Sequence, residues 1–487
     1  MQKNSAMLDS PIHFQTIVEL AENIRRKCFS PVEVTKHFLN QIDRLDMTLK
    51  AYRCVCPDFA LAQAKSAEIN IYKGNDLGLL HGIPYSIKDL FDVKGLPTTA
   101  GTNLLRENIA TEDATVVKKM ATGGMVLLGK TNTVQFAYSG VGINNDHGTP
   151  HNPWSERPHV PGGSSSGSAV SVAGGLSAVS IGSDTGGSVR IPAALCGITG
   201  LKPTAGRVSR AGVYPLSMTM DSFGPLARSA EDAAHIYQQI QGIDLEDRTT
   251  FGLPLAETVK PLRRGIKGLR LFFAETVFWD DIDPEVETAV RDCGKVFQGL
   301  GAHVESMDFE IAADAQDLNS KRTIIPAEAY TVNQKWLENH FDQMDPLVAC
   351  RMIYGKKVSA ADYLKSICEL RRLQVVAKKS LDSIDALLVP TTCIPTLPLS
   401  ELISDNEAYK EKNKLYLRNT SIGNTLNLCS LSLPCGFTKE GLPIGLMIYG
   451  KPFTEAILLK IGYSFQVATN WHQRVPDLSW IRRSFKK

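Results

Sequence analysis

The sequence lacks a surplus of charge of either sign. Its 53 lysines and arginines stand against 51 aspartates and glutamates, which leaves a formal net charge of +2 over 487 residues. No block of like charges marks a nucleic-acid-binding arm or an acidic tail. With 43% hydrophobic residues, the composition is that of a globular protein. The balance of positive and negative residues excludes a partner selected mainly by charge, such as a nucleic acid.

Long apolar runs are also missing. No stretch offers the ~18 uninterrupted apolar residues that span a bilayer. The start of the chain lacks the charged residues and apolar run of a secretory signal. We therefore expect a soluble cytoplasmic protein without a membrane partner.

Cysteine is too sparse for a disulfide framework, with ten residues in the chain. Cys54 and Cys56 form a C-x-C pair without a second pair or a histidine cluster beside it, so we expect no zinc or other metal site. Five further cysteines stand alone among apolar or helical neighbours, which favours buried thiols in a reducing cytoplasm: Cys28, Cys196, Cys293, Cys350 and Cys368.

What is present is an alternation of helical and strand-like segments. A capping box at Ser30-Pro31-Val32-Glu33 and the apolar spacing after it predict an N-terminal helical segment within residues 1–70, packed on the core. Strands are expected near 83–87, 125–128, 269–273, 302–306, 386–389 and 444–449, and helices near 114–121 and 284–300.

Such alternation over residues 71–487 predicts the α/β class, with one large sheet covered by helices on both faces. The length alone leaves open one large domain or two smaller ones. Residues 310–380 are mainly helical, and they either shape a substrate pocket or form outer-layer helices.

A glycine- and serine-rich segment runs from Pro161 to Pro203. By composition alone it would be a flexible linker. Its apolar residues contradict that interpretation, because a solvated linker does not carry them: Ala169, Val170, Val172, Ala173, Leu176, Ala178, Val179 and Ile181. The segment is predicted to be buried backbone, in which glycines allow close packing and positive φ.

Ser188 follows two glycines, where the backbone can turn and aim consecutive N–H groups at a developing oxyanion. A serine nucleophile needs a base. Lys88 ends an apolar strand, and a desolvated lysine can lose its proton and act as one, although a lone lysine after a strand favours the surface. Four histidines have no sequence link to Ser188 and are expected in loops or on the surface: His81, His147, His151 and His159.

Taken together, the motifs of the chain resemble those of the amidase signature family, from about Ser30 to about Gln466. The ordered matches are Gly82-Ile83-Pro84 with Lys88-Asp89, Gly162-Gly163-Ser164-Ser165, Asp184-Thr185-Gly186-Gly187-Ser188 with Arg190, and Cys196-Gly197 with Gly200-Leu201-Lys202-Pro203. The resemblance implies a single large catalytic domain with a central mixed, twisted β-sheet.

The same resemblance implies a Ser-cisSer-Lys triad. Ser188 would be the nucleophile, Ser164 the bridging serine at a cis peptide, and Lys88 the base. The oxyanion hole would be formed by the N–H groups of Thr185, Gly186, Gly187 and Ser188. Asp184, Arg190 and Ser165 would support this loop. Ser166 and Ile191 depart from the residues frequent in the family at their positions, but neither is in the triad.

The expected activity is hydrolysis of a non-peptide carbon–nitrogen bond through an acyl-enzyme, without metal or organic cofactor. The substrate would be a small amide, carbamate or ester, and a homodimer is left open. Four residues are expected either to line the substrate pocket or to belong to the core: Phe136, Tyr138, Gly140 and Ile191.

Two rival interpretations remain. Gly124 to Thr131 satisfies a P-loop pattern, but its bulky apolar residues indicate a strand rather than a phosphate cradle. The alternative function is the glutaminase subunit of a tRNA-dependent amidotransferase, which passes ammonia to a partner. Such subunits bind glutamine with an acidic side chain shortly before an Asn-Leu pair. Residues Arg418 to Asn424, before Asn427-Leu428, hold no carboxylate, which favours the stand-alone hydrolase.

Overall fold

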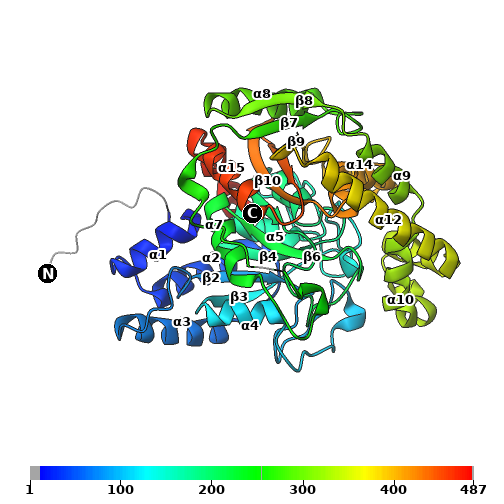
Figure 1. The fold of residues 1–487 in the computed structure, drawn as a ribbon. Coiled ribbons are helices and arrows are strands. Elements are labelled where there is room, and N and C mark those ends of the chain that lie inside the picture. The colour runs from blue at the N-terminus through cyan, green and yellow to red at the C-terminus, as the bar shows by residue number, and fades with distance from the viewer. Residues whose placement is uncertain (1–10, 254, 485–487) are drawn as a thin grey trace.

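One mixed sheet of eleven strands runs through the molecule (Figure 1). The computed structural model describes residues 11–253 and 255–484, so the first ten residues of the predicted N-terminal segment lie outside the described residues. The strands are β1 Tyr52–Val55, β2 Pro84–Lys88, β3 Val126–Thr131, β4 Val179–Asp184, β5 Thr199–Lys202, β6 Ser222–Ala227, β7 Arg270–Ala274, β8 His303–Met307, β9 Ala386–Pro390, β10 Cys429–Phe437 and β11 Pro443–Gly450. The predicted single large α/β domain is confirmed.

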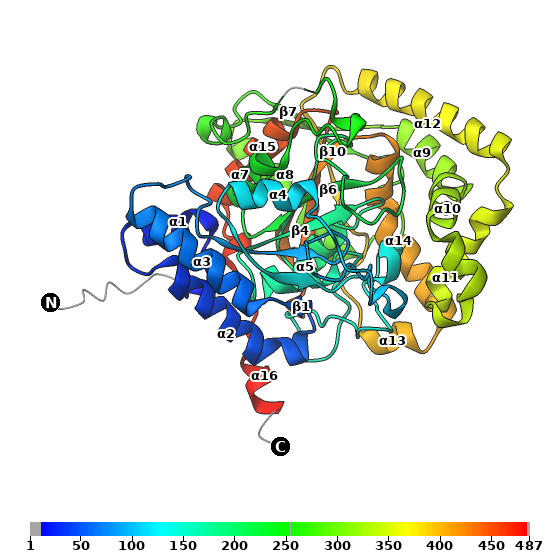
Figure 2. The same cartoon turned by 90° about the horizontal axis from the view of Figure 1, so that it is seen from below.

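The helices surround this sheet. Their bounds are α1 Ile17–Arg25, α2 Pro31–Leu49, α3 Pro57–Tyr72, α4 Thr115–Thr122, α5 Ser166–Ala173, α6 Arg190–Leu195, α7 Ala230–Ile240, α8 Pro284–Gly299, α9 Ile311–Ser320, α10 Ile324–Asn339, α11 Pro346–Ile353, α12 Ala360–Ser380, α13 Leu399–Ile403, α14 Asn406–Thr425, α15 Glu455–Ala468 and α16 Ser479–Ser484. Figures 1 and 2 place α1–α3 and α10–α12 at opposite ends of the molecule.

The strand order is β1-β3-β2-β4-β6-β5-β10-β11-β9-β7-β8. Strands β3, β2 and β4 run parallel to one another, as do β9, β7 and β8. The strands between them pair antiparallel, which makes the sheet mixed. The parallel pairing of β2 with β4 brings the ends of these two strands to the same edge of the sheet.

Helices cover both faces. Leu433 of β10 contacts Gly462 of α15, and Leu446 of β11 pairs with Leu433, so it lies on the same face. The next residue in β11, Gly445, faces Ala194 of α6 instead. Because neighbouring residues of a strand point to opposite faces, α6 and α15 lie on opposite sides of the sheet.

The N-terminal segment is helical, with one interruption. Ser30 accepts a hydrogen bond from Glu33 N and Glu33 accepts one from Ser30 N, so the expected capping box begins α2. The interruption is β1, a strand that the sequence analysis did not expect, which pairs antiparallel with β3 at the sheet edge. The four residues of β1 are too short a run to show a period of two in the sequence.

Six of the eight residues of the P-loop pattern, Val126 to Thr131, form β3. Gly129 and Lys130 pair with β2 in the sheet, so the pattern forms no phosphate-binding loop. The buried Lys130 ammonium is instead 2.7 Å from the carboxylate of Asp89.

Six of the ten cysteines are buried, but three of the five isolated ones are not. Cys28, Cys350 and Cys368 are exposed, whereas Cys196 and Cys293 are buried. Cys350 and Cys368 lie on the outward faces of α11 and α12, where a helical neighbourhood does not imply burial. Of the four histidines, His81 and His159 are buried, although both lie in loops as expected.

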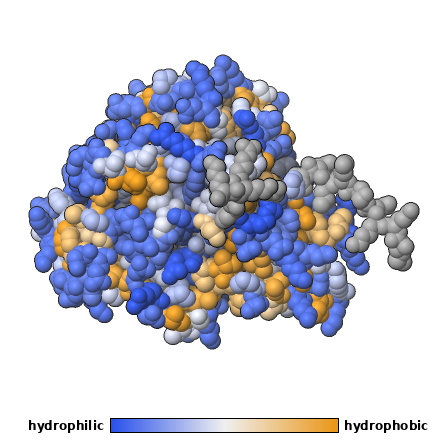
Figure 3. Space-filling view, turned by 180° about the vertical axis from the view of Figure 1, so that it is seen from behind, coloured by the Kyte–Doolittle hydropathy of each residue, from blue (hydrophilic) through white to orange (hydrophobic). Residues whose placement is uncertain are grey.

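None of the helices within the described ranges has both the length and the hydropathy to cross a bilayer. On the face shown in Figure 3, apolar residues form separate patches between hydrophilic ones.

Candidate active site

Lys88 and Ser164 lie in direct contact beneath the surface. Lys88 is the last residue of β2, and its Nζ donates to Ser164 Oγ at 2.7 Å. Ser164 follows a cis peptide bond with Gly163, at the position where the family resemblance implied one, and lies two residues before the start of α5. Both side chains are fully buried. The structure therefore brings together two of the three predicted triad residues.

A second serine holds the same lysine. Ser183, near the end of β4, accepts a hydrogen bond from Lys88 Nζ at 2.8 Å. Sequence reasoning missed this residue. Its signal is its position directly before Asp184, since β4 lies beside β2 and the two strands end at the same edge.

The surroundings of Lys88 favour its neutral form. Burial lowers the pKa of Lys88 to about 7, while the charges of Asp221 and Asp184 act in the opposite direction. A substantial fraction of the side chain is therefore an unprotonated amine at neutral pH. Such an amine can accept a proton from a neighbouring hydroxyl.

Ser188 approaches this pair from the loop after β4. Its backbone carbonyl accepts a hydrogen bond from Ser165 N at 3.1 Å, which ties the Ser188 segment to the residue after Ser164. The Ser188 side chain is nearly buried, with 4% exposed. No hydrogen bond joins Ser188 Oγ to Ser164 Oγ in the described part of the chain, so the relay between these two hydroxyls is not closed in this conformation.

The loop of residues 185–188, called the nucleophile loop after the predicted role of Ser188, leaves N–H groups free. Within the described residues, the N–H groups of Gly186, Gly187 and Ser188 donate to no protein acceptor. A Cβ on Gly187 would lie 2.1 Å from Thr420 Oγ1, and its φ of 139° also requires glycine. These donors can converge on one negatively charged oxygen.

Two residues from distant segments hold the nucleophile loop. Thr185 Oγ1 donates to Asp221, which lies before β6. Thr420 Oγ1, from α14, donates to the carbonyl oxygen of Gly186 at 2.7 Å. The sequence analysis found neither Asp221 nor Thr420, because no local motif relates them to the loop.

A buried ion pair braces the start of the loop. Arg190 Nη2 lies 2.8 Å from Asp184 Oδ1, and both side chains are fully buried. Burial disfavours the Asp184 carboxylate, but the charge and hydrogen bonds of Arg190 outweigh burial and lower the pKa of Asp184 to about 2. Asn424 of α14 donates to Asp184 at 2.9 Å and accepts from Arg190 at 2.6 Å. Asp184 and Arg190 therefore contact each other at the start of the loop that they are predicted to support. The third predicted supporting residue, Ser165, donates from its Oγ to Ser183 O at 3.2 Å.

Two of the four pocket candidates lie beside the nucleophile loop, and a third belongs to the core. Gly140 and Ile191 lie beside the nucleophile loop, where the side chain of Leu417 meets them: its Cγ is 3.0 Å from the position of a Cβ on Gly140. Phe136 is instead a core residue, 1% exposed, with its ring against Tyr214. Leu417 was missed in the sequence because α14 is far from the loop along the chain.

Tyr138 is the fourth candidate, and the guanidinium of an arginine packs against its ring. The guanidinium of Arg351, from α11, lies 4.1 Å from the centroid of the Tyr138 ring, and its Nη1 donates to the Tyr138 carbonyl at 2.6 Å. Burial raises the pKa of Tyr138, so its hydroxyl is protonated at neutral pH.

A family model described as Amidase matches residues 33–459. The A subunit of the glutamyl-tRNA(Gln) amidotransferase of Ruthia magnifica is 35% identical over 490 residues, which cover 96% of this chain and 100% of the relative.

Two solved structures are similar in fold. A protein complex described as revealing the evolutionary origins of an s-triazine catabolic enzyme has a TM-score of 0.87 and 30% identity, over 93% of this chain and 98% of that one. The native peptide amidase of Stenotrophomonas maltophilia has a TM-score of 0.82 and 28% identity, over 94% and 98%.

Proposed function

The chain belongs to the amidase family, and on this premise we propose that it hydrolyses an amide bond through an acyl-enzyme on Ser188. One observation carries the proposal: Lys88, with its pKa lowered to about 7 by burial, donates to Ser164 Oγ beside a loop that holds Ser188 and three free N–H groups. No metal or organic cofactor has a role in this scheme.

The proton relay follows from these contacts. Neutral Lys88 takes the proton of Ser164 while Ser164 takes that of Ser188, and the Ser188 oxygen bonds to the carbonyl carbon. The N–H groups of Gly186, Gly187 and Ser188 stabilise the oxyanion. Collapse breaks the carbon–nitrogen bond, and the relay returns a proton to the leaving amine. Water then attacks the ester by the same route and releases the carboxylic acid and free Ser188.

Similarity to the Ruthia magnifica relative makes glutamine the first candidate substrate. The relative belongs to an amidotransferase, and this chain matches its whole length. The comparisons thus favour the glutaminase-subunit function, which the sequence analysis ranked second. In that role the chain would release ammonia from glutamine and work with partner subunits.

A stand-alone amidase is the second candidate, and Leu417 favours it. The described side chains of α14 that reach the nucleophile loop or its braces are Leu417, Thr420 and Asn424, and none is acidic. The amino group of glutamine is a cation and needs an acceptor, whereas Leu417 offers an apolar wall beside Gly140. This wall suits an aryl or alkyl acyl group, in an amide, carbamate or ester.

The test is a substrate panel: glutamine, benzamide, an anilide, a phenyl carbamate and a phenyl ester, with ammonia, amine or phenol release measured. Ser188→Ala is expected to lower kcat by several orders of magnitude and to prevent acyl-enzyme formation seen by mass spectrometry. Retained turnover in Ser188→Ala would refute the mechanism.

Leu417→Asp separates the two substrate classes. If the pocket takes apolar acyl groups, this variant loses benzamide hydrolysis and gains relative activity on glutamine. If the wild-type chain already prefers glutamine, and copurifies with partner subunits when coexpressed with them, the amidotransferase function stands and the stand-alone one fails.

A further inference from the structure

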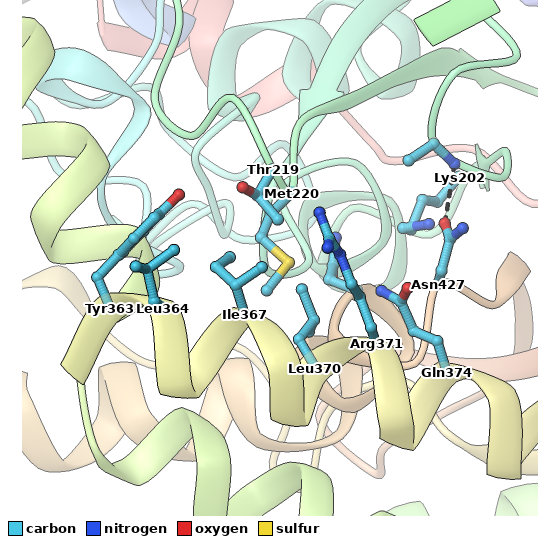
Figure 4. Close-up of a pocket in the computed structure, with 12 residues that line it drawn as sticks. Lys202, Thr219, Met220, Tyr363, Leu364, Ile367, Leu370, Arg371, Gln374 and Asn427 are labelled. Atoms are coloured by element: carbon cyan, nitrogen blue, oxygen red, sulfur yellow. Dashed lines mark hydrogen bonds between the residues drawn. The ribbon is translucent and has the colours of Figure 1, made fainter. Parts of the chain in front are cut away.

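A cavity of about 380 Å³ lies between α12, the end of β5 and the loop before β6. Figure 4 shows side chains of α12 pointing across it toward Thr219, Met220 and Lys202. We propose that this α12 cavity binds a small amphipathic carboxylate, with an aryl or short alkyl body and one anionic group. The residues that carry the proposal are Lys202, Met220, Ile367, Leu370, Arg371 and Asn427.

The polar side of the α12 cavity is cationic. It contains Lys202 and Arg371, and none of the twelve described residues that line it is acidic. Arg371 is exposed, and its guanidinium forms no hydrogen bond or ion pair within the described chain. Arg372, the next residue, instead pairs with Glu369 at 2.7 Å and faces Asp314 at 3.7 Å. A guanidinium without a partner beside a cavity is a strong donor for a carboxylate.

Two carboxylates near the α12 cavity are already bound by other groups. Glu328 accepts a hydrogen bond from Tyr363, on the cavity wall, at 2.6 Å. Asp184, whose charge acts on Lys202, is paired with Arg190 at 2.8 Å. Neither carboxylate is therefore available to neutralise Arg371.

Lys202 and Asn427 each keep a donor. Lys202 Nζ donates to the carbonyl oxygens of Pro203 and Leu428, which leaves one of the three ammonium hydrogens. Asn427 Oδ1 accepts from Ala205 N at 3.1 Å, so its amide hydrogens remain to be donated. An anionic group between Lys202 and Arg371 would satisfy both cations.

The other side of the α12 cavity is apolar. Met220, Ile367 and Leu370 form this side, with the exposed Leu364 beside them. Pockets for small organic ligands have volumes of roughly 300–1,000 Å³. The cavity is at the lower end of that range, which suits a molecule of about ten non-hydrogen atoms such as phenylacetate.

Asn424 lies between the α12 cavity and the ion pair that braces the nucleophile loop. It lines the α12 cavity, and its side-chain amide binds the Asp184–Arg190 pair that braces the nucleophile loop. A ligand there would touch the support of the loop and none of the reacting atoms. The binding proposal therefore does not depend on the proposed hydrolysis, and the two can fail separately.

The experiment measures phenylacetate binding by isothermal titration calorimetry in the Ser188→Ala protein, which removes turnover. 2-Phenylethanol is the neutral counterpart of similar shape. Arg371→Gln is expected to weaken phenylacetate binding about tenfold, because one charge-assisted hydrogen bond is lost. Arg372→Gln is the matched control and should leave the affinity unchanged.

A second variant, Leu364→Glu, places a carboxylate at the cavity without disturbing a buried residue, and should weaken phenylacetate binding as well. Three results would each overturn the proposal: no binding of phenylacetate to the Ser188→Ala protein, equal affinity for phenylacetate and 2-phenylethanol, or equal losses in Arg371→Gln and Arg372→Gln.

Discussion

Lys88 sets the pH behaviour of the proposed reaction. Its pKa is lowered to about 7 by burial, so the proton that blocks the relay binds as pH falls through that value. We expect kcat/KM to rise from pH 6 to pH 8 and then to level off. In Lys88→Arg, activity should be absent at every pH, since a guanidinium does not deprotonate in this range.

A variant at Ser183 tests whether the pKa of Lys88 sets the acid limb of the kcat/KM profile. The Ser183 hydroxyl accepts a hydrogen bond from Lys88, and an acceptor stabilises an ammonium more than a neutral amine. Ser183→Ala should therefore lower the pKa of Lys88 and move the acid limb of the kcat/KM profile to lower pH. Ser180→Ala, in the same strand, removes a buried hydroxyl that has no hydrogen-bond partner among the described residues. It should leave the limb in place, and an unmoved limb in Ser183→Ala would contradict the role of Ser183.

At this scale, the sequence predicted the residues that lie within motifs. Ser188, Ser164 and Lys88 were identified through the family resemblance, and the structure brings Lys88 and Ser164 into contact. Thr420 and Asn424 could not be found, because their contacts to the loop join residues more than 230 positions apart. Such contacts depend on how α14 packs, and no local pattern records it.

Among the elements, the loop between β4 and α6 depends on a buried ion pair. Asp184 receives hydrogen bonds from Val189 N, Arg190 and Asn424. Asp184→Asn would leave the Arg190 guanidinium buried without a countercharge, and the free energy of unfolding should fall by about 3–5 kcal/mol. Chemical denaturation followed by circular dichroism measures this change.

The control for Asp184→Asn is an exposed ion pair. Lys295 and Asp292 lie on the surface of α8, and Lys295→Gln should leave the unfolding curve unchanged. If Asp184→Asn unfolds at the same denaturant concentration as Lys295→Gln, the ion pair does not stabilise the loop.

The elements themselves were predictable where apolar runs or caps mark them. Strands β7, β8, β9 and β11 and helix α8 lie within one or two residues of the expected bounds. Strands β5 and β6 were not expected. They are rich in small or polar residues and contain glycine, such as Gly200 and Gly224, which weakens their β-propensity in the sequence. Their place in the sheet comes from pairing with β10 and β4.

Across the whole molecule, burial is uneven. Every residue of β11 is buried, whereas α12 buries four of its twenty-one residues. Regions with few buried contacts open more readily. We therefore expect amide hydrogens of α12 to exchange faster than those of β11 in hydrogen-exchange mass spectrometry. Equal protection of the two segments would contradict this expectation.

The exposed thiols are sites for covalent labelling of the folded protein. Cys28, Cys350 and Cys368 are the exposed cysteines of the described chain, and each lies on a different segment. Cys368 is one helical turn from Arg371 on α12. With Cys28, Cys350 and the half-buried Cys54 replaced by serine, a maleimide fluorophore would attach at Cys368 on the folded protein. Its emission would then report, in real time, whether the neighbouring cavity is empty or filled.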